Sequence, residues 1–271
     1  MQFLRNVLIN ASSIINQRRW LQQEARRLKQ SEGEAAAVLV RALEAVSGND
    51  FSPEEKNLIR KIETLRKSLL VSKERIELPD YGAGTVSQHT NNGRRPQTTI
   101  GRITISSKSS FWAGLLFKLI RELRPKTCLE MGTNMGMSAS YQASALQLNG
   151  AGKLITLEGS QPRARQARKN LDHLRLNNVE IVNGRFQDIL PGVLKRCGPV
   201  DFVFIDGHHD EEATKKYFLE ILPYASGSAL FIFDDIAWSE GMKRAWQVIR
   251  NHPQVKASAD LYVMGICLVG K

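Results

Sequence analysis

The sequence predicts an α/β fold, in which helices cover a doubly wound, mostly parallel sheet and a helical extension precedes it. Short apolar runs alternate with longer polar segments from residue 111 onward, the pattern of strands joined by helices. The residues before position 78 are rich in Ala, Leu, Glu, Gln, Lys and Arg, which favours helices. Each apolar run is followed by polar side chains, at the edge where open parallel sheets bind ligands. The runs are 128–131, 154–158, 179–182, 200–206 and 229–233.

Three regions follow from these patterns: a helical extension at 1–78, a connecting segment at 79–110 and a ligand-binding domain at 111–271. The connecting segment is rich in glycine, proline and asparagine and poor in apolar residues. A segment of this length is expected to be a lid over the site or a flexible linker. As part of a lid, His89 would touch the substrate.

Two helices have recognisable starts. Ser52 is the expected N-cap of a helix that runs to about residue 71, because Pro53 follows in the first turn and Glu55 completes a capping box. A second, apolar helix is expected over 111–123 and leads into the first strand.

The turn after the first apolar run carries two glycines. Gly132 permits a sharp turn, and Gly136 lets a helix start against a ligand without a Cβ in the way. A dinucleotide-binding loop would place another glycine two residues before Gly132, but Glu130 stands there. An acid before the turn suits a cationic ligand without phosphates. Taken alone, the motif also fits an ordinary strand-to-helix turn.

The second and third runs end in side chains that suit a nucleoside. Glu158 closes the second run, where a ribose would lie if a ligand crosses the tips of neighbouring strands. Phe186 and Gln187 follow the third run and offer an aromatic face and an amide to an adenine.

The fourth and fifth runs end in carboxylates. Asp206 closes the fourth run and precedes His208 and His209, while Asp234 and Asp235 follow the fifth. A lone carboxylate at a strand end is often a helix N-cap. Three carboxylates at neighbouring strand ends indicate a site.

Composition excludes several classes of protein. The hydrophobic residues, 42% of the chain, occur in segments shorter than the about 18 apolar residues of a membrane span. The apolar N-terminal stretch is interrupted by Arg5, Asn6 and Asn10 and has no cleavage site, so we expect a cytoplasmic location. The three cysteines have no metal-binding spacing and are expected to be reduced thiols in or near the core. They are Cys128, Cys197 and Cys267.

The net charge of +11 is concentrated partly on one predicted N-terminal helix. A basic helix face is either simply solvated or makes peripheral contact with an acidic surface. Specific nucleic-acid binding is not expected, because the chain has no RNA-binding signature, zinc finger or helix-turn-helix. The N-terminal helices could also join two copies in a homodimer. The basic residues of the helix are Arg18, Arg19, Arg26, Arg27 and Lys29.

Residues 106–271 resemble the class I S-adenosylmethionine-dependent methyltransferases, in particular the catechol O-methyltransferase-like branch and its bacterial small-molecule relatives. The first motif of that branch, E-x-G-x-x-x-G-x-S, is met at Glu130, Gly132, Gly136 and Ser138. The resemblance implies a Rossmann-like, seven-stranded sheet and S-adenosylmethionine as cofactor. It also implies that these four residues bind the cofactor, with Ser138 holding the methionyl carboxylate.

The later motifs extend the resemblance. The acid that binds ribose in the family falls on Glu158. The motif G-x-x-Q-D falls on Gly184, Gln187 and Asp188, which implies that Gln187 lies near the adenine beside Phe186. Asp206 is expected at the same site.

Metal-dependent members of this branch have Asp at the end of strand four, Lys three residues later and an Asp-Asn pair after strand five. The corresponding residues here are Asp206, His209 and the pair Asp234-Asp235. The resemblance implies that the three carboxylates bind Mg²⁺ or Ca²⁺, whose preferred ligands are oxygens. His209, in place of the lysine, is the first candidate for a catalytic base, His208 is the second, and Asp206 is expected to assist.

The function expected from these features is O-methylation of a hydroxyl group on a small molecule, with or without a divalent metal. One alternative is methylation of RNA, which the charge favours and the absence of an Asn-Pro-Pro-Tyr-like motif disfavours. Another is a non-catalytic module that binds a cofactor or a partner. No motif identifies the acceptor.

Overall fold

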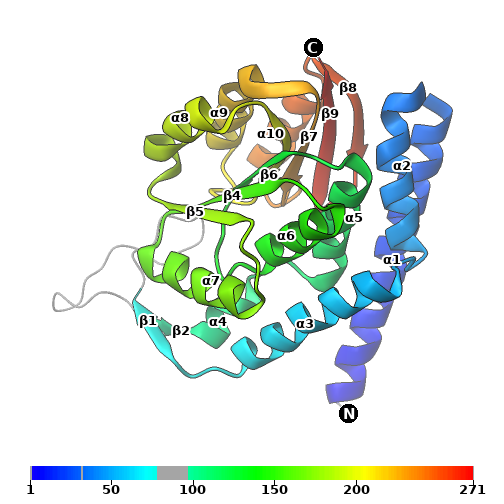
Figure 1. Ribbon diagram of the computed structural model, residues 1–271. Helices are drawn as coiled ribbons and strands as arrows, with labels where there is room; N and C mark the ends of the chain where they lie inside the picture. Colours follow the sequence, from blue (N-terminus) through cyan, green and yellow to red (C-terminus); the bar gives the residue numbers. More distant parts are fainter. Residues whose placement is uncertain (1, 32, 78–96, 271) are drawn as a thin grey trace.

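The computed structural model describes residues 2–31, 33–77 and 97–270 (Figure 1). Most of the expected connecting segment, including His89, lies outside the described residues, so its role as a lid or linker stays a prediction.

The domain is built on a seven-stranded sheet in the order β5-β4-β3-β6-β7-β9-β8. The pairs from β5 to β7 are parallel, whereas β9 runs antiparallel to β7 and to β8. The predicted Rossmann-like, mostly parallel sheet is therefore confirmed. Its strands are β3 (Thr127–Met131), β4 (Lys153–Glu158), β5 (Val179–Asn183), β6 (Val200–Ile205), β7 (Ala225–Asp234), β8 (Val255–Asp260) and β9 (Met264–Gly270).

The strand order reverses at β3. The chain leaves β3 for β4 on one side and later returns to β6 on the other side. At such a switch point the connections diverge and leave a crevice outside the carboxyl ends of the strands. The four central strands β3, β4, β6 and β7 end at Met131, Glu158, Ile205 and Asp234, so the predicted polar residues gather at this edge.

Helices cover both faces of the sheet (Figure 1). Along β3, Cys128 packs into the core on one face, and Leu129 and Met131 pack into the core on the other. A strand buried on both faces reads as a continuous apolar run. The Cys128 face is covered by α5 (Ser110–Leu123), α6 (Met137–Asn149) and α7 (Gln161–His173), and the opposite face by α8 (Phe186–Cys197), α9 (Glu211–Ile221) and α10 (Glu240–Arg250).

The N-terminal helices are α1 (Gln2–Ser31), α2 (Gly33–Ser47) and α3 (Pro53–Leu70). The predicted capping box at the start of α3 is confirmed, since the Glu55 amide donates to Ser52 Oγ at 3.2 Å and the Ser52 amide donates to Glu55 Oε2 at 3.0 Å. Leu28 of α1 and Leu43 of α2 are buried in the same apolar cluster as Phe117 of α5. The extension therefore shares a core with the sheet domain (Figure 1).

Charged contacts also join the extension to the domain. Lys118 Nζ of α5 lies 2.6 Å from Glu55 Oε2, and Arg121 Nε lies 3.1 Å from Glu55 Oε1. Tyr141 of α6 donates its hydroxyl hydrogen to Glu63 Oε1 at 2.8 Å.

A small antiparallel ribbon of β1 (Arg75–Glu77) and β2 (Gln97–Thr99) comes next, where the sequence had favoured only helices before residue 78. The short helix α4 (Ile100–Ile105) follows β2 and leads to α5 through residues 106–109. None of the described helices is long and apolar enough to cross a bilayer. Cys128, Cys197 and Cys267 are free and buried, as expected.

Candidate functional site

The turn between β3 and α6 requires glycine. Gly132 has a φ of +112°, and a Cβ at this position would overlap the carbonyl oxygen of Asp206 at the end of β6. Gly136, at the N-cap of α6, has a φ of +76° and faces Ala167 of α7. The bare backbone can thus run close against its neighbours and leave room for a ligand above the strand tips.

Glu158 is held at the end of β4 by two backbone amides. Asn134 and Ser160 each donate a backbone hydrogen bond of 2.8 Å to its carboxylate, and the residue is 6% exposed. Asn134 belongs to the glycine turn, so Glu158 links the turn to β4. A carboxylate can accept about four hydrogen bonds.

Glu130 lies beneath the turn, fully buried. Gln142 Nε2 and Thr156 Oγ1 each donate a 2.6 Å hydrogen bond to its carboxylate, and Ser138 also interacts with it. Burial raises the pKa of Glu130 to about 7, although the three hydrogen-bonding neighbours oppose the shift. In this position Glu130 and Ser138 connect β3, β4 and α6. The cofactor-binding role expected of these two residues stays a prediction.

The pKa of Glu130 makes stability depend on pH. The usual value is 4.5 and the folded value is about 7, so the folded state binds the proton more tightly. The stabilisation that protonated Glu130 gives the fold is therefore present below pH 4.5 and is lost as the pH rises to 7. As the pH rises from 4.5 to 7, we expect the free energy of unfolding of Glu130→Gln to increase by roughly 3 kcal/mol relative to that of the parent. Urea unfolding at a series of pH values measures this difference. Glu180→Gln is the exposed control, and parallel curves for parent and Glu130→Gln would contradict the assignment.

An aromatic cluster stands beside the end of β6. The Phe186 and His208 rings meet edge to face at 5.4 Å, and His208 stacks on Tyr217 at 5.7 Å. His208 Nδ1 also lies 2.7 Å from the Tyr217 hydroxyl. A Cβ on Gly207 would come within 2.6 Å of the Phe186 ring. His208 is thereby fixed in the cluster, while Gln187, next to Phe186, is exposed to solvent.

His209 lies between two of the predicted carboxylates. Its Nε2 is 3.6 Å from Asp206 Oδ1 and its Nδ1 is 3.9 Å from Asp235 Oδ2. His209 and Asp235 have φ angles of +44° and +52°, a region that non-glycine residues enter rarely and often at functional sites. The structure therefore brings Asp206, Asp234, Asp235 and His209 to one place, as the sequence predicts.

Lys108 lies with these carboxylates, although sequence reasoning did not place it at the site. It precedes α5, and its ammonium contacts Asp234 Oδ2. The side chains of Lys108 and Asp234 are 11% and 1% exposed. Burial alone would lower the pKa of Lys108, but the charges of Asp206, Asp234 and Asp235 together raise it. The only sequence signal was an isolated cation among the serines at 106–110.

The same surroundings raise the pKa values of the three carboxylates. Burial raises the pKa of Asp234 to about 7, assisted by the charge of Asp206 and opposed by Lys108. Burial also raises the pKa of Asp206 and of Asp235. Ser106 Oγ, from the loop that carries Lys108, accepts a 3.2 Å hydrogen bond from Asn134 Nδ2. One loop thus touches both the glycine turn and the carboxylates.

The expected divalent metal does not fit this arrangement. Within the described residues, no group of three or more His, Cys, Asp or Glu side chains is placed to hold a metal ion. An oxygen of Asp234 is taken by the Lys108 ammonium, whose positive charge would repel a second cation. The carboxylates as placed suit an ammonium ion better than Mg²⁺ or Ca²⁺.

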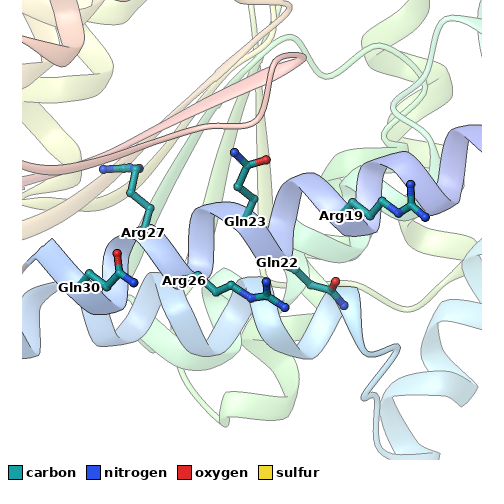
Figure 2. A pocket seen from close by; sticks show the side chains of 6 residues that line it. All are labelled: Arg19, Gln22, Gln23, Arg26, Arg27 and Gln30. Carbon is teal, nitrogen blue, oxygen red and sulfur yellow. The ribbon is translucent and has the colours of Figure 1, made fainter.

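A separate pocket lies on α1, where Figure 2 shows the side chains that line it. Arg27 is anchored by contacts to Glu24 and to the carbonyl oxygen of Ser258 in β8. The lining is polar and positively charged, in keeping with the basic helix predicted from the sequence. It consists of Arg19, Gln22, Gln23, Arg26, Arg27 and Gln30.

Sequence comparison relates the sheet domain to known proteins. Residues 129–236 match the family model described as a methyltransferase domain. The chain is 36% identical over 126 residues to a catechol O-methyltransferase of Niastella koreensis, covering 45% of this chain and 55% of that protein. It is 31% identical over 146 residues to the catechol O-methyltransferase of Mus musculus, covering 50% of this chain and 54% of that protein. The chain thus spans about half the length of these relatives.

Solved structures share the fold. An O-methyltransferase from Bacillus cereus in complex with SAH superposes with a TM-score of 0.57 at 21% identity, covering 79% of this chain and 91% of that one. A putative O-methyltransferase from Klebsiella pneumoniae gives 0.53 at 18% identity, covering 86% and 96%. At these identities the likeness shows the fold alone. Residues 129–236 thus match a methyltransferase domain, and the larger domain formed by β3 to β9 has the fold of these solved structures.

Proposed function

We propose that this protein is an S-adenosylmethionine-dependent O-methyltransferase that methylates a hydroxyl group of a small molecule. The observation that carries the proposal is the placement of Glu158. Two backbone amides hold its carboxylate at the carboxyl end of β4, beside a turn in which Gly132 leaves no room for a Cβ.

The residues at this edge fit the cofactor. Gly132 and Gly136 would allow the cofactor to approach the backbone closely, Glu158 would accept hydrogen bonds from the ribose hydroxyls, and Phe186 with Gln187 would border the adenine. When bound, S-adenosylmethionine supplies a methyl group already activated by a positively charged sulfur. The protein then has to align the acceptor, exclude water and remove the acceptor proton.

His209 is the group that takes the acceptor proton. An imidazole can accept a proton at one ring nitrogen, which suits a general base. Asp206 and Asp235, at 3.6 and 3.9 Å, flank its two ring nitrogens, so they orient the ring and stabilise the cation formed when it accepts a proton. His208 is the weaker candidate, because its Nδ1 is engaged by the Tyr217 hydroxyl.

Two considerations support a small-molecule hydroxyl as the acceptor. The curated relatives are named catechol O-methyltransferases, and a base beside the strand ends is needed for a hydroxyl group, which must lose its proton to become a strong nucleophile. A divalent metal is not part of the proposal, because Lys108 stands among the carboxylates that would bind it.

Glu158→Ala tests the cofactor site. We expect this substitution to cost roughly 2–3 kcal/mol of binding free energy, or about 30–150-fold in affinity, because hydrogen bonds from ribose to a charged acceptor are lost. Calorimetric titration with S-adenosylhomocysteine measures the change.

Glu180→Ala is the matched control, since Glu180 lies on the neighbouring strand β5 with its side chain 46% exposed and paired with Arg196. Its affinity should equal that of the parent. Unchanged affinity in Glu158→Ala would remove Glu158 from the cofactor site.

A further inference from the structure

The carboxylate cluster at the ends of β6 and β7 contains its own cation. Asp206, Asp234 and Asp235 converge on Lys108, whose ammonium contacts Asp234 Oδ2. The Asp234 side chain is 1% exposed, and isolated charges are rarely buried to this extent without a partner. The positive charge of Lys108 thus offsets the mutual repulsion of the three carboxylates.

The surrounding structure holds Lys108 in place. Ser109, the next residue, is the N-cap of α5, which is buried along most of its length. On the other side, Ser106 accepts a hydrogen bond from Asn134 in the glycine turn. Both ends of the short loop are therefore anchored, which holds the backbone of Lys108 beside the carboxylates.

The Lys108 ammonium can also donate hydrogen bonds beyond the one to Asp234. An ammonium ion can donate three hydrogen bonds, and within the described part of the chain Lys108 donates one, to Asp234. The attraction of three carboxylates keeps it charged, since they raise its pKa despite burial. It lies in the same cluster of carboxylates as His209, the proposed base.

We propose that Lys108 is the resident cation of the acceptor site, where it takes the place of a divalent metal and receives the acceptor oxygen as His209 removes the proton. This inference rests on the proposed function for the identity of the acceptor, but not for the exclusion of metal. In this step the O–H bond of the acceptor breaks, its proton moves to the imidazole of His209, and the negative charge left on oxygen faces the Lys108 ammonium. Asp234 acts as a positioning residue for the lysine.

Metal binding tests the inference without an acceptor. Mn²⁺ is titrated into the full chain and followed by electron paramagnetic resonance, with and without S-adenosylhomocysteine. The parent should show no saturable Mn²⁺ site. Lys108→Ala leaves Asp206, Asp234 and Asp235 without their cation, so it should show one saturable Mn²⁺ site where the parent shows none. Lys108→Arg keeps the charge and should behave as the parent does.

Two further variants control this experiment. Lys108→Met preserves the bulk of the side chain and should gain the same Mn²⁺ site even if the alanine variant folds poorly. Lys118→Met removes another 11% exposed lysine that pairs with a carboxylate, Glu55, and should gain no site. A parent that binds Mn²⁺ as tightly as Lys108→Ala, or alanine and methionine variants that gain nothing, would overturn the inference. Failure of S-adenosylhomocysteine to bind would instead count against the proposed function.

Discussion

Replacing His209 by alanine is expected to lower kcat by roughly 10²–10⁴-fold while leaving cofactor affinity nearly unchanged. The reason is position. His209 lies within 4 Å of two carboxylates at the ends of β6 and β7 and follows a strand whose end packs against the glycine turn. Among the described residues the other imidazole at this edge, His208, is engaged by the Tyr217 hydroxyl.

The measurement is transfer of a labelled methyl group from S-adenosylmethionine to a hydroxylated acceptor found by screening with the parent. His173→Ala is the control, because His173 lies in the last turn of α7 with an exposed side chain and should keep the parent rate. His208→Ala should mainly weaken cofactor binding, since His208 packs against Phe186. A His209→Ala enzyme with near-parent kcat would contradict the assignment of the base.

Gly132→Ala is expected to destabilise the fold by roughly 3–5 kcal/mol. The φ of +112° is one that L side chains rarely adopt, and the new Cβ would overlap the backbone of Asp206. Relief would require β3 and β6 to separate at the site. We therefore also expect loss of S-adenosylhomocysteine binding in the fraction that folds.

Gly192→Ala in α8 is the matched control, because a Cβ there meets nothing within 4 Å. In a helix this change is stabilising by about 0.5–1 kcal/mol, opposite in sign to Gly132→Ala. Urea unfolding of the two variants beside the parent measures both effects. Equal stabilities for Gly132→Ala and the parent would show that the turn does not need glycine.

Much of the sheet could be predicted from the sequence. Strands buried on both faces, such as β6, read as apolar runs because neither face meets water. The start of α3 could also be predicted, because Ser52 and Glu55 form a local capping box and Pro53 stands in the first turn. The C-terminal end was predicted less well: strand and helix were expected to alternate to the end, yet β8 and β9 follow one another as an antiparallel pair. Their turn contains no glycine, and Tyr262 takes a positive φ of +67° there.

The site was harder to predict where it depends on distant segments. Asp206 and His209 lie just after β6, and Asp234 is the last residue of β7, so the sheet alone brings them together. Lys108 precedes α5 by two residues and reaches Asp234 across 126 positions of the chain, a contact that no local pattern encodes. The position of Glu130 beneath the turn also depends on long-range partners, Gln142 and Thr156.

We propose that S-adenosylmethionine binds at the carboxyl ends of the parallel strands. Calorimetric titration of the purified full chain with S-adenosylhomocysteine tests it most directly. We expect one saturable site per chain, from which S-adenosylmethionine displaces S-adenosylhomocysteine. A folded chain that shows no binding heat and no displacement by either molecule would contradict it.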